Sequence, residues 1–268
     1  MNSKISILFF VFLAFFFVSC SISPEDREAI VTVIELRENA INSGDVVSYR
    51  ALLSDSFDDI DKHMEQVKLR NQFLHNLTYL FTTTQVSKVS GFGKQADIDV
   101  EFYLTYKRPD DVAPYVWIDR EETISFKKDD IGWRITGVKD VKDSGTMIKP
   151  ETVQAVFHTL DTRISALNNG DVELFDTIVY KNYPGRKEVT GNFAANKEVF
   201  SDINYELQGR RFLFMSENME NTRLEQTYSL SFKIKDTEEF QRFKNQKEVI
   251  SLKRDPQKNI WVITDGLK

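Results

Sequence analysis

Histidine and cysteine, the side chains that most often carry chemistry, are few in this sequence. The three histidines, His63, His75 and His158, form no HxH or HExxH pair, the spacing that lets two imidazoles bind one metal ion. His63 and His75 fall in one predicted helical segment, but they are too far apart in it to share a metal. No glycine-rich phosphate loop and no GxSxG motif is present. The sequence therefore predicts no metal and no cofactor, and we interpret each histidine as a satisfied core or surface side chain.

The only cysteine, Cys20, closes an apolar run near the N-terminus. Residues 5–18 are almost uniformly apolar and Lys4 precedes them. This run is shorter than the roughly 20 residues of a membrane-spanning helix, and it suits a signal-peptide core of about 7–15 residues. Its end, Phe17-Val18-Ser19-Cys20, resembles the bacterial lipobox, although leucine is usual where Phe17 stands. A secretory signal that ends by chance in a cysteine is the alternative.

The lipobox resemblance implies that residues 1–19 are removed and that Cys20 receives acyl chains such as palmitate. Each buried CH₂ contributes about 0.8 kcal/mol, so two or three chains anchor a protein almost irreversibly. Residues 20–24 would then form a short tether. No aspartate follows Cys20. Among lipoproteins this implies export through the periplasm to an outer membrane, where the cell has one.

The composition argues for a folded protein and against nucleic-acid binding. Without residues 1–19, whose one charged side chain is Lys4, the chain carries 34 basic and 41 acidic side chains, a net charge of −7. Such a surface repels phosphate backbones. Hydrophobic residues make up 41% of the sequence and aromatic residues 12%, which is typical of a globular core. The length favours two domains.

The chain repeats itself at an offset of 126 positions, the separation of Gly44 from Gly170. At this offset residues 40–46, 104–107 and 124–127 match residues 166–172, 230–233 and 250–253. After a two-residue insertion, residues 133–136 match residues 261–264. We therefore predict two complete domains, 25–143 and 149–268, separated by a short polar stretch.

Each copy predicts helices first and strands afterwards. Apolar residues at helical spacing follow the start signals Ser23-Pro24 and Pro150. Gly44 and Gly170 suit the ends of these helices, and the recurring Asp45 and Asp171 suit the caps of the next ones. A third helix is predicted over 61–76 and 192–202. Alternating strands are predicted at 98–106, 115–127 and 132–139, and again at 247–254 and 259–265. This order is typical of an α+β fold, with helices on one side of an antiparallel sheet.

Three features of both copies carry a resemblance to a known superfamily. They are the N-x-G-D junction, an aromatic residue after the second helix (Phe57 and Tyr183), and a closing strand of the form G/N-x-W-x-I/V. Both copies resemble the nuclear transport factor 2-like superfamily of SnoaL-like, cystatin-like cones. The resemblance implies two tandem cone-shaped domains, packed on each other like the dimer common in that superfamily. The superfamily includes ketosteroid isomerase, scytalone dehydratase and many bacterial lipoproteins. None of its catalytic sets matches this sequence residue by residue, so no catalytic role is carried over.

The repeat allows one copy to be read as a variant of the other. The predicted buried face of the long strand is apolar in the first copy: Ile98, Val100, Phe102, Leu104 and Tyr106. The second copy has Leu224, Gln226, Tyr228, Leu230 and Phe232 instead. A buried amide must be bonded to protein, water or ligand. Gln226 is therefore either a structural hydrogen-bonding residue or the polar anchor of a small-molecule pocket, with Gln226, Tyr228 and Tyr205 as its candidate ligand contacts.

Two functions of different class remain at this stage. The first is a lipid-anchored module that binds a small apolar ligand or a protein partner without catalysis. The second is an isomerase, dehydratase or cyclase that uses a carboxylate as base in the cone. Asp97, Asp99 and Glu101 alternate onto the face of the strand opposite the apolar one, which favours binding over catalysis.

Overall fold

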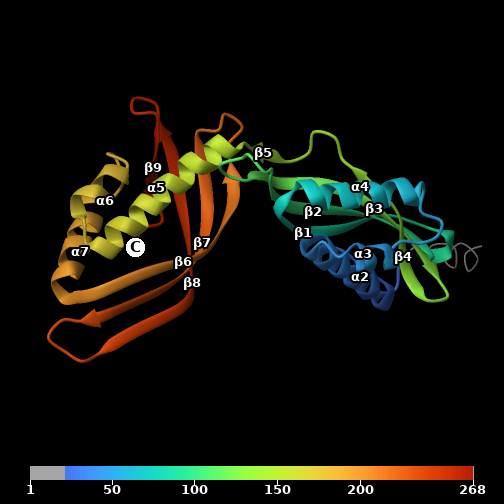
Figure 1. The fold of residues 1–268 in the computed structure, drawn as a ribbon, viewed down its shortest axis with the longest axis horizontal. Coiled ribbons are helices and arrows are strands. Elements are labelled where there is room, and N and C mark those ends of the chain that lie inside the picture. The colour runs from blue at the N-terminus through green and yellow to red at the C-terminus, as the bar shows by residue number, and fades with distance from the viewer. Residues whose placement is uncertain (1–21, 268) are drawn as a thin grey trace, which may run out of the picture. The chain divides into compact units, whose positions relative to one another are not determined.

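The protein is described by a computed structural model that covers residues 22–267 and shows one series of elements twice (Figure 1). The predicted signal peptide and Cys20 lie outside the described residues. No helix within residues 22–267 is long and apolar enough to cross a membrane.

Each copy consists of three helices followed by a four-stranded antiparallel meander. The first copy contains α2 (Pro24–Ser43), α3 (Val46–Ala51), α4 (Ile60–Phe73), β1 (His75–Ser90), β2 (Gln95–Lys107), β3 (Tyr115–Asp129) and β4 (Gly132–Asp140). After β5 (Thr146–Ile148), the second copy contains α5 (Pro150–Asn169), α6 (Val172–Ile178), α7 (Arg186–Val199), β6 (Phe200–Met215), β7 (Asn221–Ile234), β8 (Phe240–Asp255) and β9 (Ile260–Asp265). The strand orders are β1-β2-β3-β4 and β6-β7-β8-β9. The fold is therefore α+β, as predicted.

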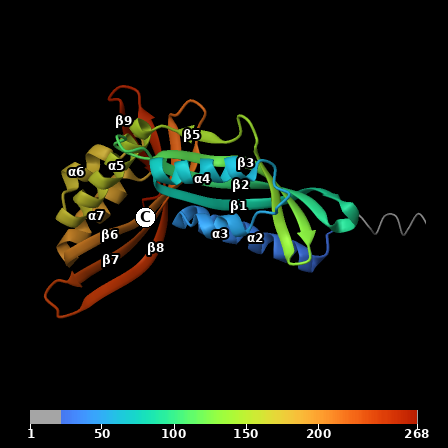
Figure 2. The ribbon, with the colours of Figure 1, turned by 45° about the vertical axis from the view of Figure 1, so that its right-hand side comes forward.

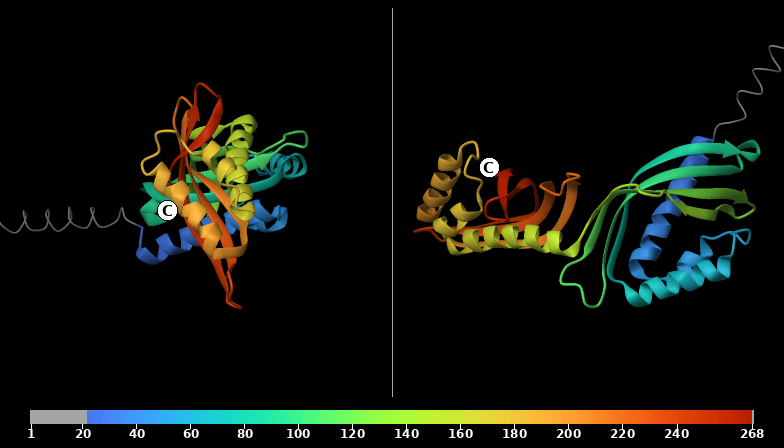
Figure 3. Two further views of the ribbon diagram at one scale, coloured as in Figure 1. Left: turned by 90° about the vertical axis from the view of Figure 1, so that its left-hand side faces the viewer. Right: turned by 90° about the horizontal axis from the view of Figure 1, so that it is seen from above.

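The chain divides into two compact units. Of the described residues, the first unit holds residues 22–111 and 119–145, and the second holds residues 112–118 and 146–267. Residues 112–118 belong to the second unit because the start of β3, Val116–Ile118, pairs with β5. The strand β5 leads directly into α5, the first helix of that unit. In each unit the helices lie against one face of the sheet (Figure 3).

The helix boundaries follow from local chemistry that the repeat preserves. Gly44 and Gly170 end α2 and α5 in the left-handed conformation, with φ of 68° and 62°. The carboxylates of Asp45 and Asp171 accept backbone N–H groups of the first turns of α3 and α6. The recurring aspartates are thus helix caps, as predicted.

The third helix and the strand that follows it differ from the prediction. The helix α4 ends at Phe73 and α7 spans Arg186–Val199, so both predicted ranges were wrong at their ends. His75 opens β1 and does not share a helix with His63. The strands β1 and β6 were not predicted, because each is an edge strand whose few buried residues show no regular apolar alternation.

The core of the first unit lies between the helices and one face of the sheet. Ile30, Ile34 and Ile41 of the first helix are buried against alternate residues of β2, among them Ile98 and Val100. Trp133 and Trp261 on the last strands are 5% and 4% exposed, so both lie in the core of their unit. The first helix and two strands, β1 and β3, supply the side chains of the interior site described below.

We expect residues 149–268 alone to be soluble and to unfold in one cooperative thermal transition, because α5–α7 and β6–β9 form a complete meander with its own core. Circular dichroism should show mixed helix and strand signal that is lost in a single step. A molten or aggregated fragment would show instead that β5 and residues 112–118 are indispensable.

Candidate functional site

Three polar side chains meet in the interior of the first unit. Arg37 of α2, Tyr79 of β1 and Glu122 of β3 are each 4% exposed or less. Both Nη atoms of Arg37 donate to the carboxylate of Glu122, Nη2 at 3.1 Å from Oε2. The Tyr79 hydroxyl donates to Glu122 Oε1 and accepts from Arg37 Nη1 at 2.9 Å. We call this set the interior cluster of the first unit.

The second unit contains the same cluster at the same offset of 126 positions. Arg163, Tyr205 and Glu248 replace Arg37, Tyr79 and Glu122 in turn. Arg163 Nη1 lies 2.7 Å from Glu248 Oε1, and Nη2 lies 2.9 Å from Oε2. The Tyr205 hydroxyl donates to Glu248 Oε1. Bidentate arginine–carboxylate bonding of this kind is strong and geometrically specific.

The environment keeps each cluster charged and bonded. Burial by itself would lower the pKa of Arg37 and of Arg163, but the facing glutamates outweigh it and both pKa values are raised. Burial also raises the pKa of the Tyr79 and Tyr205 hydroxyls, so both remain protonated donors. The arginines are therefore held as cations against their glutamate partners.

The three predicted ligand contacts of the second unit come together at this cluster. Gln226 is fully buried, and its Nε2 donates to Glu248 Oε1 at 3.2 Å. Its Oε1 accepts from Arg210 Nε at 2.7 Å. Both ends of the Gln226 amide are thus bonded to protein. Of the two interpretations that the sequence allowed, this is the structural hydrogen-bonding residue and not the anchor of a pocket. Tyr205 is likewise committed to Glu248.

Tyr228 differs from the other two. It is half-buried, and its ring stacks on that of Tyr205 with centroids 4.2 Å apart. The first unit has the same stack between Tyr79 and Phe102, at 4.6 Å. The phenyl ring is therefore a shared packing element, whereas the Tyr228 hydroxyl is an addition of the second unit and bonds to no other residue within 22–267.

Sequence reasoning missed the interior clusters, although a signal existed. Arg37 and Arg163 stand at matching places within the apolar stripes of α2 and α5. The offset that revealed the repeat also relates the tyrosines and the glutamates. Identical charged residues recurring in two otherwise diverged copies indicate a shared structural partner, and a test of every polar position at that offset would have found all three.

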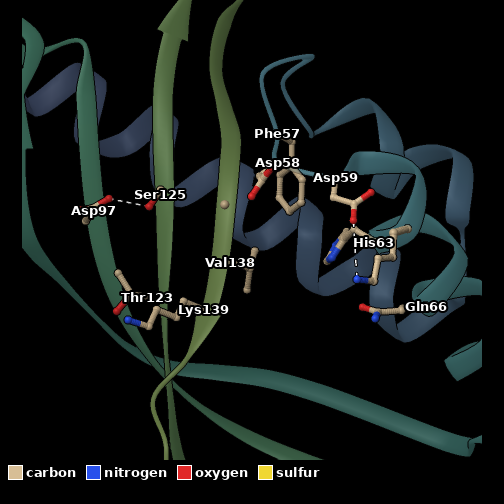
Figure 4. A pocket seen from close by; sticks show the side chains of 12 residues that line it. Phe57, Asp58, Asp59, His63, Gln66, Asp97, Thr123, Ser125, Val138 and Lys139 are labelled. Carbon is tan, nitrogen blue, oxygen red and sulfur yellow. Dashed lines mark hydrogen bonds and ion pairs between the residues drawn. The ribbon is translucent and has the colours of Figure 1, made fainter.

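A cleft of about 700 Å³ opens on the first unit beside β4 (Figure 4). Asp97, Thr123, Ser125, Gly137, Val138 and Lys139 line it from the sheet, and Phe57, Asp58, Asp59, Lys62, His63 and Gln66 line it from α4 and the preceding loop. Ser125 Oγ donates to Asp97 at 2.7 Å, and Thr123 donates to Asp99 at 2.8 Å. Asp97 and Asp99 thus lie on the face opposite the buried Ile98, as predicted.

His63 is the titratable group of this cleft with the most perturbed surroundings. Its Nε2 lies 3.0 Å from the Tyr49 hydroxyl, and its ring packs 4.7 Å from that of Phe57. Burial, followed by the charges of Arg37 and Arg70, lowers its pKa, so the imidazole is neutral near pH 7. Among residues 22–267 no group of three or more histidine, cysteine and acidic side chains is placed to hold a metal ion.

The second unit shows that the fold does not require this polar pair. Phe175 and Val189 stand at the positions of Tyr49 and His63. There Phe175 packs on Phe193 with ring centroids 4.7 Å apart. Since apolar packing builds the same junction of short helix and third helix, Tyr49 and His63 are specific to the first unit.

No family model matches this chain, and no curated protein matches its sequence. Its structure is similar to a nuclear transport factor 2-like superfamily protein from Salmonella enterica at 12% identity, over 44% of this chain and 92% of that chain, with a TM-score of 0.38. It is also similar to a type 3 hexachlorocyclohexane dehydrochlorinase from Novosphingobium barchaimii at 10% identity, over 46% of this chain and 89% of that chain, with a TM-score of 0.38. A conserved protein from Planctomyces limnophilus is similar at 12% identity, over 47% of this chain and 100% of that chain, with a TM-score of 0.38. Each match covers about half of this chain and most or all of the other.

We expect Arg37→Met to lower the free energy of unfolding of the first unit by about 3–5 kcal/mol, because it leaves Glu122 buried without its cation. Replacing both partners, Arg37→Met with Glu122→Leu, should recover part of that loss. Arg50→Met is the control, since its ion pair with Asp55 is exposed and worth about 0–1 kcal/mol. Urea denaturation measures all three, and an Arg37→Met protein as stable as the control would contradict the assignment.

In the second unit we expect Gln226→Val to cost about 1–3 kcal/mol, because it orphans Arg210 Nε. Tyr228→Phe removes a hydroxyl without a protein partner and should leave stability level. Any loss of a co-purifying small molecule in Tyr228→Phe, seen by mass spectrometry, would then report on ligand contact alone. Equal stability of Gln226→Val and the unmodified protein would refute the structural role of the amide.

Proposed function

We propose that this chain is a membrane-anchored extracytoplasmic lipoprotein whose two domains bind a ligand or a protein partner and do not catalyse a reaction. The anchor is Cys20 at the end of the lipobox-like run, and an outer membrane is its expected destination. The packing of the two domains as a pseudo-dimer stays a prediction.

The hydrogen bonds of the buried Glu122 and Glu248 are the observation that supports a non-catalytic role. An isomerase or dehydratase that works from inside such a domain needs an acid or base with a free lone pair facing the substrate. Glu122 accepts from Arg37 at both oxygens and from Tyr79. Glu248 accepts from Arg163, Tyr205 and Gln226. Both carboxylates are therefore committed to holding the fold.

Among the residues described above, the Tyr228 hydroxyl and the cleft of the first unit are candidate ligand contacts, and they differ in chemistry. Tyr228 offers one hydroxyl beside the aromatic ring of Tyr205, which suits a small, largely apolar ligand. The cleft of the first unit offers carboxylates, hydroxyls and lysines around Phe57, which suits a polar ligand. We favour the cleft as the main binding surface because its Tyr49–His63 pair is not demanded by the fold.

One observation favours the alternative, an isomerase, dehydratase or cyclase. His63 is neutral, bonded to Tyr49 and open to the cleft, so it has the protonation state of a general base. His63→Gln separates the two readings, because glutamine can still bond to Tyr49 and line the cleft but cannot take up a proton. Binding of a cleft ligand should survive this change in a binding module, whereas turnover by an enzyme should fall by about 10²–10⁴-fold.

For the anchor we expect Cys20→Ser to abolish acylation and to release the protein from membranes, because no other cysteine is present. Metabolic labelling with an alkyne palmitate, followed by membrane fractionation, measures both effects. Ser21→Ala, a change at the adjacent position, should keep the label and the membrane association. Label persisting on Cys20→Ser would end the lipoprotein proposal.

A further inference from the structure

The turn between β1 and β2 presents a phenylalanine to solvent. Phe92 is 92% exposed and has a φ of 57°, between Gly91 at 58° and Gly93 at 81°. Bulky side chains rarely adopt the left-handed region, and an exposed phenyl ring gains nothing from packing. The Gly-Phe-Gly turn therefore carries conformational strain that the folded unit itself does not repay.

A second apolar side chain is exposed on the neighbouring turn. Ile131, between β3 and β4, is 77% exposed. The two turns are held together, because the Lys128 N–H donates to the Lys94 carbonyl at 2.8 Å. Both turns lie at the same end of the first unit (Figure 2). We call Phe92 and Ile131 the apolar tips.

The apolar tips stand where the chain enters the first unit. Asp26, in the first turn of α2, accepts from Lys128 Nζ at 2.6 Å and from Trp133 Nε1 at 2.9 Å. Ser23 caps the same helix. Cys20 is only two residues before Ile22, so the chain between their Cα atoms spans at most about 7 Å whatever its conformation. Acyl chains on Cys20 therefore bring this end of the unit to the bilayer surface.

The second unit again provides an internal control. Asn218 stands at the position of Phe92, and the turn between β8 and β9 consists of Pro256, Gln257, Lys258 and Asn259. In the unit that is not joined to the anchor, a polar residue thus stands at the tip of each turn, and the one apolar side chain beside Asn218, that of Met219, is half-buried. The fold does not require apolar tips, and they occur in the unit that follows Cys20.

We propose that Phe92 and Ile131 insert into the membrane interface, so that the first domain docks on the bilayer by its anchored end instead of swinging on the tether. This inference rests on the proposed acylation of Cys20. Aromatic and aliphatic side chains partition into the headgroup boundary of a bilayer. Inserted there, the phenyl ring gains the contacts that it lacks in the folded unit.

The test uses the full acylated chain. Acylation blocks the Cys20 thiol, so Phe92→Cys carries one free thiol that can take an environment-sensitive fluorophore such as nitrobenzoxadiazole. In vesicles of phosphatidylethanolamine and phosphatidylglycerol, emission from position 92 should shift to shorter wavelength and brighten. Asn218→Cys, labelled in the same way, is the matched control and should emit as in water. A water-like signal at position 92, or an equal shift at position 218, would overturn the inference.

Two further measurements separate the possible failures. The unmodified chain treated with the same reagent should take no label, and labelling of Cys20 would overturn the anchor together with this inference. Phe92→Asn places a residue that tolerates the left-handed region in the turn, so its thermal midpoint should be equal or higher. A lower midpoint would show that Phe92 supports the fold, and it would count against a membrane role.

Discussion

The buried arginine–glutamate pair with its tyrosine donor is the interaction on which each unit depends. It ties the first helix to an edge strand and to the third strand of the meander, so one cluster sets how the helix lies on the sheet. Its net contribution to stability is modest, because two charges must leave water, but losing one partner is costly. If the helix packed elsewhere on the sheet, the arginine and the glutamate would be separated and each would be a buried charge without its partner. The pair therefore specifies where the first helix lies on the sheet.

The second unit extends this cluster outward. Gln226 joins Glu248 to Arg210, which forms a further ion pair with Asp161 at 2.7 Å, and the Arg210 guanidinium lies 5.0 Å from the centre of the Phe157 ring. The first unit has Val100 in place of Gln226 and closes its core with apolar contacts. The two copies thus share the same arginine–tyrosine–glutamate cluster, and the strand position beside that cluster is polar in the second unit and apolar in the first. A duplicated domain can change in this way without losing its fold.

With the interior charges satisfied, the features left for interaction lie at the periphery. The cleft beside β4 and the two apolar tips belong to the first unit, and the second unit replaces their key residues with Phe175, Val189 and Asn218. Tyr228 is the corresponding addition of the second unit. Each copy serves as a control for the other, and the differences indicate which side chains the fold does not need.

The sequence by itself determined the features that depend on neighbours in the chain. The caps at Gly44 and Asp45 and the alternation along β2 are readable within a short window. The α+β order follows from the succession of such windows, and the repeat follows from comparing the chain with itself. Only the tertiary structure revealed β1 and β6, because these edge strands have few buried residues and the spacing of those residues forms no alternating pattern. It also revealed the interior clusters. Arg37 and Glu122 are 85 residues apart, and each looks like a surface charge until the fold buries both together and makes each the counter-charge of the other.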